Sequence, residues 1–348
     1  MRGTLAGFDV QSRTTSIGGH TMAYVDKGSG PPVLLVHGNP TWSFYYRSLL
    51  SALPPLGLRA VAPDHIGMGR SDKPSAADYP HTLSRRVADL GEFIEGLGLT
   101  EPLSLVVHDW GGAIALAWAV DHVEQLDRLV VLNTGAFPLP PGKGLPWTLK
   151  AARLPLVGDF AVRRLNAFSV GALALGSGRR WLPAGARAGL LAPYDSPAHR
   201  VAVSQFVQDI PLGPDDPAHA VLARTEQRLH LLAGVPTLVC WGMKDPVFDE
   251  TVLSHLLTLL PHAEVHRYAD AGHYVLEDAA DRIVPLVSGF LAQSPAPGQD
   301  QGSPVGVGAG PLGQQPVERP AHRVAGGGEG ARNADASGTI RSAASSST

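Results

Sequence analysis

An apolar run, Leu105–Val107, passes directly into a polar turn, His108-Asp109-Trp110, and two glycines then open a helical pattern. A strand, a sharp turn and a helix in this order are typical of the turn that presents a nucleophile to an active site. The central residue of the turn is Asp109, and Val107 departs from the usual pattern, which has glycine at that position. We predict that Asp109 is a nucleophile; the alternative is a carboxylate that caps the following helix.

An aspartate at this position restricts the chemistry. A serine that attacked a saturated carbon would form an ether, which water does not reopen. An aspartate forms an alkyl ester instead, and the carboxylate can be regenerated from that ester. Asp109 therefore predicts displacement at an sp³ carbon and makes ordinary esterase or peptidase activity a poor interpretation.

A base, and a charged group that orients it, should follow later strands of the same sheet. His273 stands in a loop just after the last predicted strand, and histidine suits general-base work near neutral pH. Asp245 follows the preceding strand. We predict His273 as the base and Asp245 as its acid. Asn133, which is neutral, and Asp249 remain alternatives for the acid position.

The leaving group requires donors that stabilise an anion. Asn39 follows a buried strand and Trp110 follows the nucleophile, so an amide and an indole N–H could serve. Each residue has a simpler interpretation, an Asn-Pro turn for Asn39 and core packing for Trp110. We predict both as leaving-group donors. We expect no cofactor and no metal. A single cysteine, Cys240, cannot build a cysteine zinc site or an internal disulfide.

Apolar strand-like runs alternate with helical patterns over the first 294 residues, which predicts an α/β fold with a mostly parallel sheet and helices on both faces. The predicted strands are Phe8–Ser16, His20–Lys27, Val33–Val36, Arg59–Ala62, Leu103–Val107, Leu126–Leu132, Thr237–Trp241 and Glu264–Tyr268. The predicted helices include Trp42–Leu53, Leu83–Leu97 and Gly112–Val120. A Gly-rich loop at 64–74 is interpreted as a structural crossover with a hydrogen-bonded His65.

The alternation stops between residues 137 and 228, where prolines and short helical patterns replace buried strands. We predict a helical cap there, inserted into a core domain made of 1–136 and 229–294. Residues 295–348 contain 32 Gly, Ala, Ser or Pro among 54 and no aromatic residue except histidine. Because such a segment buries too little apolar area to offset its ordering entropy, we predict a disordered tail.

Composition excludes several classes of protein. The chain has 348 residues, 28 Lys or Arg and 31 Asp or Glu, and therefore a formal charge of −3. The sequence lacks the basic block that would indicate nucleic-acid binding and the polybasic patch that would indicate membrane binding. It also lacks a strongly cationic amphipathic helix. No apolar run approaches the roughly 18 residues of a transmembrane helix. We expect a soluble, cytoplasmic protein.

Four motifs resemble the haloalkane dehalogenases of the α/β-hydrolase superfamily. They are His37-Gly-Asn-Pro-Thr-Trp42, His108-Asp-Trp-Gly-Gly112, Trp241-Gly-Met-Lys-Asp245 and Gly272-His273. The resemblance implies an α/β-hydrolase fold in which Asp109 is the nucleophile, His273 the base and Asp245 the acid. It also implies that Asn39 and Trp110 bind the halide or another leaving group. Epoxide hydrolases share the Asp-Trp-Gly-Gly stretch but usually have an aromatic residue at the position of Asn39.

Further stretches look like the β-lactone decarboxylases of bacterial long-chain olefin biosynthesis, a group of dehalogenase homologues. They are Asn133-Thr-Gly-Ala-Phe-Pro-Leu-Pro140, Pro193-Tyr-Asp-Ser196, Phe206-Val-Gln-Asp-Ile-Pro-Leu212 and Asp270-Ala-Gly-His-Tyr-Val-Leu-Glu-Asp278. This resemblance covers about Gly18 to Leu291 and includes the predicted cap. It implies decarboxylation of cis-β-lactones to cis-alkenes, with a β-lactone synthetase and other enzymes of the pathway as partners.

Three alternatives stay open at this point. A haloalkane dehalogenase would use the same five residues and a water molecule to release alcohol and halide. An epoxide hydrolase and a non-catalytic ligand-binding protein are weaker interpretations, the latter because a receptor needs no activated nucleophile. The cavity under the cap should discriminate between the first two enzymes, since long alkyl chains require a deep apolar space and a haloalkane a small one.

Overall fold

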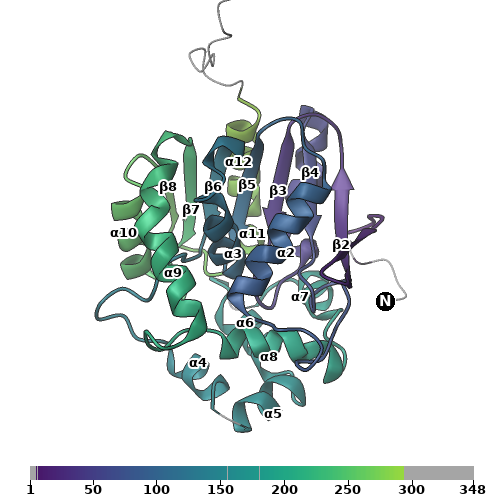
Figure 1. The fold of residues 1–348 in the computed structure, drawn as a ribbon, viewed down its shortest axis with the longest axis vertical. Coiled ribbons are helices and arrows are strands. Elements are labelled where there is room, and N and C mark those ends of the chain that lie inside the picture. The colour runs from purple at the N-terminus through teal and green to yellow at the C-terminus, as the bar shows by residue number, and fades with distance from the viewer. Residues whose placement is uncertain (1–4, 6, 155, 180, 294–348) are drawn as a thin grey trace, which may run out of the picture. The chain divides into compact units, whose positions relative to one another are not determined.

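The computed structural model describes residue 5 and residues 7–154, 156–179 and 181–293. The predicted tail lies outside these residues. An eight-stranded sheet runs through the described part in the order β1-β2-β4-β3-β5-β6-β7-β8 (Figure 1). Its strands are β1 Arg13–Ile17, β2 His20–Lys27, β3 Pro32–Val36, β4 Arg59–Pro63, β5 Leu103–His108, β6 Leu126–Leu132, β7 Thr237–Gly242 and β8 Glu264–Tyr268. The β1–β2 and β2–β4 pairs are antiparallel and all others are parallel. The prediction of a mostly parallel α/β sheet is confirmed.

The central strands are buried on both faces, and alternate side chains belong to two separate cores. Leu105 and Val107 of β5 pack into one core, whereas Val106 between them packs into the other. Helices α2 (Leu83–Gly96), α3 (Trp110–Ala119), α9 (Pro217–Arg228) and α10 (Glu250–Leu259) contribute to the first core. Helices α1 (Arg47–Ala52), α7 (Ala184–Leu191), α11 (Val275–Asp278) and α12 (Ala280–Leu291) contribute to the second. This alternation is why the apolar runs of the sequence are continuous rather than of period two.

Two predicted elements differ from the structure at their ends. The first strand begins at Arg13 rather than Phe8, because Phe8 packs edge-on against Trp42 and Phe44 with ring centroids 5.3 Å apart. The helix predicted over Trp42–Leu53 starts as a 3₁₀ turn, η1 (Ser43–Tyr46), and becomes α-helical only at Arg47. In both places apolar residues serve tertiary packing rather than a regular period.

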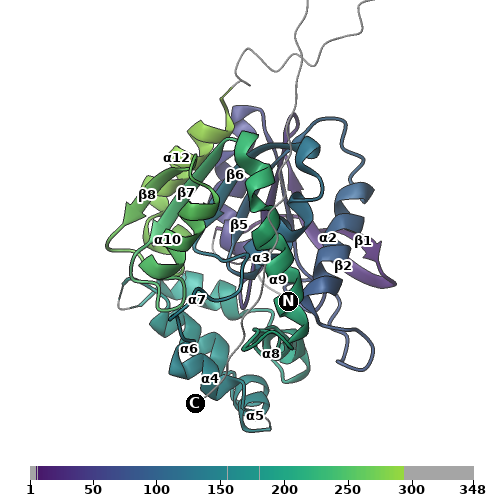
Figure 2. The ribbon, with the colours of Figure 1, turned by 60° about the vertical axis from the view of Figure 1, so that its left-hand side comes forward.

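Between β6 and β7 the chain forms a group of short helices beyond the carboxyl ends of the strands, at the lower end in Figures 1 and 2. They are α4 (Trp147–Ala152), α5 (Val157–Arg163), α6 (Ala167–Leu175), α7, η4 (Ala198–Arg200) and α8 (Val201–Gln208). Helix α9, inside the range predicted as cap, packs beside α2 and α3, and η5 (Leu229–Gly234) leads from it into β7. Smaller 3₁₀ turns are η2 (Pro54–Leu56) and η3 (Val123–Gln125). No helix within the described ranges has the length and hydropathy to cross a membrane.

A largely buried carboxylate, that of Asp209, connects the end of α8 to the core. The Oδ2 atom of Asp209 accepts the N–H of Leu83 at 2.5 Å and lies 3.6 Å from Nη1 of Arg86, which is itself buried. Burial raises the pKa of Asp209 from 3.8 to about 6, although Arg86 and the Leu83 N–H act in the opposite direction. The raised pKa means that the folded state binds a proton here more tightly than the unfolded chain does.

We therefore expect Asp209 to lower the stability as pH rises. Its protonation contributes roughly 2–3 kcal/mol to the free energy of unfolding. This contribution is fully present below about pH 4 and is lost as pH rises through about 6. In Asp209→Asn, the free energy of unfolding should fall less between these pH values than in the unmodified chain. Urea denaturation at several pH values measures the difference. Parallel pH profiles for the two proteins would contradict this assignment.

Candidate active site

Asp109 occupies a strained turn between β5 and α3. Its backbone has φ 53° and ψ −131°, a conformation that residues with a Cβ rarely adopt. The turn is possible because Gly111 lies tightly against the neighbouring strand, where an added Cβ would come within 2.0 Å of the Val36 carbonyl oxygen. An added Cβ on Gly38 would likewise come within 2.1 Å of Asp109 Oδ1. The small residues thus allow the carboxylate to sit at the carboxyl edge of the sheet.

The two carboxylate oxygens of Asp109 have different surroundings. Oδ1 accepts the backbone N–H of Asn39 at 2.6 Å, while Oδ2 lies 3.6 Å from Nε2 of His273. Burial raises the pKa of Asp109, and His273 together with the backbone N–H groups of Asn39 and Trp110 limits the rise. One oxygen is therefore fixed by the backbone, and the other is available beside the imidazole.

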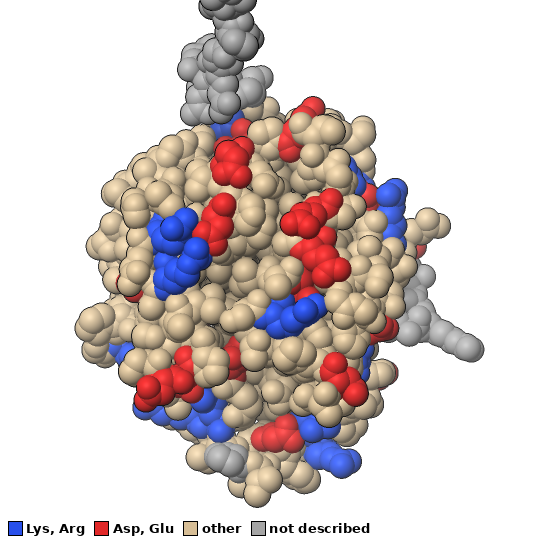
Figure 3. Space-filling model, viewed as in Figure 1, with Lys and Arg blue, Asp and Glu red and all other residues tan. Residues whose placement is uncertain are grey.

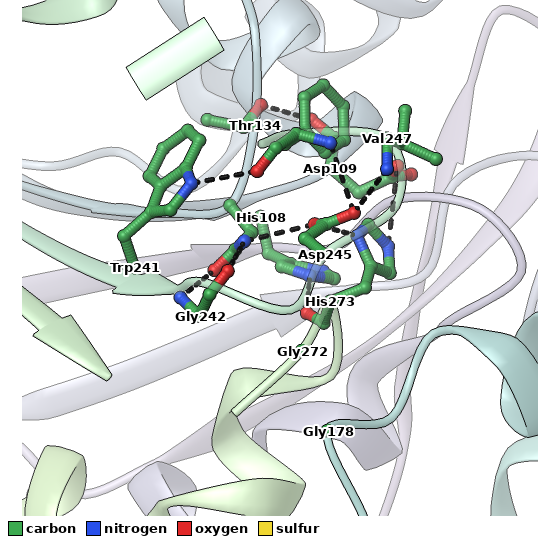
Figure 4. Close-up of polar contacts among 12 residues, drawn as sticks. His108, Asp109, Thr134, Gly178, Trp241, Gly242, Asp245, Val247, Gly272 and His273 are labelled. Carbon is green, nitrogen blue, oxygen red and sulfur yellow. Dashed lines mark hydrogen bonds and ion pairs between the residues drawn. The ribbon is translucent and has the colours of Figure 1, made fainter. Parts of the chain in front are cut away.

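His273 follows β8 and lies between two carboxylates (Figure 4). Its Nδ1 lies 2.8 Å from Oδ2 of Asp245, and its ring stacks on Phe248 with centroids 5.8 Å apart. Burial opposes protonation of His273, but the charge of Asp245, its hydrogen bond and the charge of Asp109 outweigh burial, so the pKa of His273 is raised. The arrangement favours an imidazolium held between two anions.

Asp245 is held in place by four donors. Its Oδ1 accepts the backbone N–H groups of Val247 and Phe248 at 2.8 and 3.0 Å. Its Oδ2 accepts Nδ2 of Asn133 at 3.0 Å in addition to the imidazole. The structure therefore places Asp245 against the histidine and Asn133 against Asp245.

The second alternative for the acid lies elsewhere. Asp249 caps α10 by accepting the N–H groups of Thr251 and Val252, and it pairs with Lys143 at 2.5 Å. Of the three residues considered for the acid position, Asp245 is the one that contacts the imidazole directly.

Asn39 and Trp110 both line the cavity that contains Asp109. The Nδ2 atom of Asn39 donates to the Val203 carbonyl of α8 at 3.2 Å, which leaves its second hydrogen for another acceptor. Its Oδ1 is buried without a hydrogen-bond partner. The indole of Trp110 packs beside Phe206, with ring centroids 5.5 Å apart. The two predicted donors thus line the same cavity as Asp109, one from the segment after β3 and the other from the start of α3.

Sequence reasoning missed three residues that support the site. Thr134 donates its hydroxyl to the backbone carbonyl of Asp109, and the Nε2 atom of buried His108 lies 2.8 Å from the His273 carbonyl. Asn133 was considered only as an acid, not as a donor to the acid. The available signal was position, because 133 and 134 directly follow β6, the strand beside β5.

The loop at 64–74 is structural, as predicted. His65 donates from Nε2 to the His37 carbonyl at 2.8 Å, and burial lowers the pKa of His65 well below its usual value. Asp64 accepts the backbone N–H groups of Ser43 and Arg70, each at 2.8 Å. The loop therefore holds the segment that follows β3 in place through these hydrogen bonds.

A cavity of about 820 Å³ lies between the sheet edge and the cap. Its polar end contains Asp109, His273, Asp245 and Asn39, and its walls are otherwise mainly apolar. The apolar wall includes Leu145, Leu149, Val162, Phe168, Leu222 and Val252. Across the residues that the structure describes, no group of three or more His, Cys, Asp or Glu side chains is arranged to hold a metal ion. The space suits a large apolar molecule with one reactive polar group.

Comparison with known proteins agrees with this geometry. The family described as alpha/beta hydrolase fold matches residues 31–280. The chain is 44% identical over 276 residues to a cis-3-alkyl-4-alkyloxetan-2-one decarboxylase of Shewanella oneidensis, covering 79% of this chain and 86% of the relative. A protein of the same name from Xanthomonas campestris is also 44% identical, over 80% of this chain and 94% of its own length.

Dehalogenases are more distant relatives. Haloalkane dehalogenase 2 of Mycobacterium bovis is 35% identical over 76% of this chain and 89% of its own length. Among solved structures, the haloalkane dehalogenase DbeA from Bradyrhizobium elkani superposes with a TM-score of 0.72 at 26% identity, covering 82% of this chain and 98% of that chain. Sequence similarity therefore favours the decarboxylases over the dehalogenases.

The electrostatic role assigned to Asp245 can be measured directly. In Asp245→Asn the charge is lost but burial remains, so the pKa of His273 should fall below 6.5 instead of lying above it. Protonation of His273 then no longer stabilises the fold, whereas in the unmodified chain that stabilisation persists until pH rises through the raised pKa. NMR titration of labelled histidine, with the signal assigned by His273→Gln, reports the shift. An unchanged pKa would show that Asp245 does not stabilise the imidazolium.

Proposed function

We propose that this chain, which belongs to the alpha/beta hydrolase fold family, converts cis-β-lactones into cis-alkenes and CO₂. The observation that carries the proposal is a buried aspartate nucleophile that faces a large apolar cavity. The 44% identity to two oxetan-2-one decarboxylases supports the same substrate class, since an oxetan-2-one is a β-lactone. A haloalkane would require far less apolar space than this cavity provides.

Asp109 begins the reaction by attacking the β-carbon of the lactone ring. Its Oδ2 atom is the attacking oxygen, because Oδ1 is occupied by the Asn39 N–H. The new C–O bond forms as the ring C–O bond breaks, and the ring oxygen leaves with the electron pair as part of a carboxylate. The β-carbon is inverted, and the product of this step is an alkyl ester of Asp109 with a free carboxylate on the neighbouring carbon.

Loss of CO₂ completes the reaction without water. The electron pair of the bond between the α-carbon and the carboxylate becomes the alkene π bond, and the ester C–O pair returns to Asp109. One inversion followed by one anti elimination retains the cis geometry of the ring in the alkene. Atoms and charge balance, because the lactone supplies both products and the enzyme carboxylate is regenerated.

His273 and Asp245 stabilise charge in this scheme rather than activate water. An imidazolium 3.6 Å from Asp109 Oδ2 favours departure of the aspartate as a carboxylate. Asp245 keeps the imidazole charged through its 2.8 Å contact. The backbone N–H of Asn39 holds the other oxygen throughout. The site thus stabilises Asp109 most strongly at the end of the reaction.

Asn39 and Trp110 are the donors for the carboxylate released by ring opening. Asn39 retains one amide hydrogen, and Trp110 lines the same cavity with its indole N–H as the second donor. Both donors are neutral, which suits an anion that must lose CO₂ in the next step rather than remain tightly bound. A β-lactone synthetase is the class of enzyme that would supply such a substrate. We also propose that the reaction takes place in the cytoplasm.

Replacement of the nucleophile tests the reaction. Asp109→Ala should lower the turnover of a cis-β-lactone by at least about 10⁴-fold, because no alkyl ester can form. Gas chromatography of alkene and CO₂ measures the loss, and a 1-haloalkane serves as the second substrate. Alcohol and halide from the haloalkane, without alkene from the lactone, would indicate a dehalogenase. Undiminished alkene formation by Asp109→Ala would exclude the proposed mechanism.

The cavity wall offers a test of chain-length selection. Gly171 lies in α6 on the cavity wall, and an added Cβ would have no atom within 4 Å. Gly171→Phe should therefore enter open space and reduce kcat/KM for long-chain lactones by about tenfold or more, with little effect on short-chain lactones. Gly171→Ala is the matched control and should leave the preference unchanged. Equal losses for long and short chains would show that this wall does not contact the alkyl chains.

A further inference from the structure

The cap carries a concentrated exposed apolar surface, which we call the cap face. Its members lie within residues 147–165 and comprise Trp147, Leu154, Leu156, Val157, Phe160 and Leu165. Leu156 is 86% exposed and Trp147 is 78% exposed. Single exposed leucines are ordinary on a protein surface, but six large apolar side chains within 19 residues mark a surface that another apolar phase covers.

The cap face is continuous with the cavity. Trp147, Leu154 and Val157 are exposed to solvent and also line the cavity that contains Asp109. The cavity therefore reaches the surface at the cap face, beside helices α4 and α5. An apolar molecule that enters or leaves by this route passes over the exposed apolar side chains.

The charge around the cap face differs from that of the whole chain. Residues 143–187 contain eight Lys or Arg and a single acid, Asp159, although the chain has a formal charge of −3; two of the eight, Lys143 and Arg153, pair with acids outside this range. The carboxylate of Asp159 pairs with Arg163 at 3.3 Å and accepts a hydrogen bond from the Ser204 hydroxyl at 2.8 Å. Lys150 and Arg164 are exposed beside the apolar side chains. Figure 3 shows mostly tan surface with both blue and red groups at the end that carries α4 and α5.

We propose that the cap face docks onto the surface of an anionic lipid bilayer, so that the cavity opens toward the acyl chains. Trp, Phe and Leu side chains next to Lys and Arg form the combination that binds at a membrane interface. The basic surroundings select anionic headgroups. A second copy of the chain is a poor occupant, since two symmetric cap faces would bring the same positive charges together.

Co-sedimentation with vesicles tests the proposal without any substrate, so it is independent of the proposed reaction. The full-length chain should bind vesicles of phosphatidylcholine mixed with phosphatidylglycerol, and it should bind phosphatidylcholine alone at least about fivefold more weakly. Lys150→Gln/Arg164→Gln should reduce binding to the mixed vesicles several-fold and leave binding to phosphatidylcholine unchanged.

The apolar contribution is tested by Leu156→Ser/Phe160→Ser. Both residues are exposed and neither lines the cavity, so the fold and the reactive site should be retained. The partition coefficient should fall by at least about tenfold. Leu56→Ser/Leu231→Ser is the matched control, since it removes two exposed leucines outside the cap and should bind as the unmodified chain does.

Three results would overturn membrane docking. The first is a full-length chain that does not bind the mixed vesicles, which would leave a protein partner as the occupant of the cap face. The second is an equal loss of binding in the cap variant and its control. The third is an oligomer, measured by light scattering, that dissociates in Leu156→Ser/Phe160→Ser, because a second copy would then cover the surface.

Discussion

The site depends on a carboxylate that is unfavourable both in its backbone and in its burial. Asp109 has a positive φ and is almost completely removed from solvent. Such a residue persists only where its surroundings supply compensating contacts. Here they are the Asn39 N–H on one oxygen, His273 near the other and the Thr134 hydroxyl on the backbone carbonyl. Strands β3, β5 and β6 and the loop after β8 are arranged so that these groups meet.

The parts that sequence predicted well are those in which chain order determines position. Parallel strands end at the same edge of a sheet, so polar residues directly after apolar runs meet there. Asp109, Asp245 and His273 each follow a strand in this way, and the structure brings them within contact distance. The apolar runs themselves predicted the sheet because the central strands are buried on both faces.

The parts that sequence missed depend on contacts between distant segments. Phe8 was assigned to a strand because the sequence pattern does not distinguish an apolar residue in a strand from one in an aromatic cluster. The role of Asn133 toward Asp245 depends on a side-chain rotamer, which no spacing rule specifies. The cap face was not predicted for a similar reason, since its apolar side chains come from two short helices and the connections beside them.

The cap covers the candidate site and also contacts its polar residues directly. The carbonyl of Gly176, at the end of α6, accepts the backbone N–H of His273 at 2.6 Å. The carbonyl of Val203 in α8 accepts the side chain of Asn39. His273 and Asn39 are therefore both positioned by backbone carbonyls of the cap, and the same cap supplies most of the apolar wall of the cavity. Because this one segment determines both the shape of the apolar cavity and the placement of His273 and Asn39, we expect a change in the cap to affect both together.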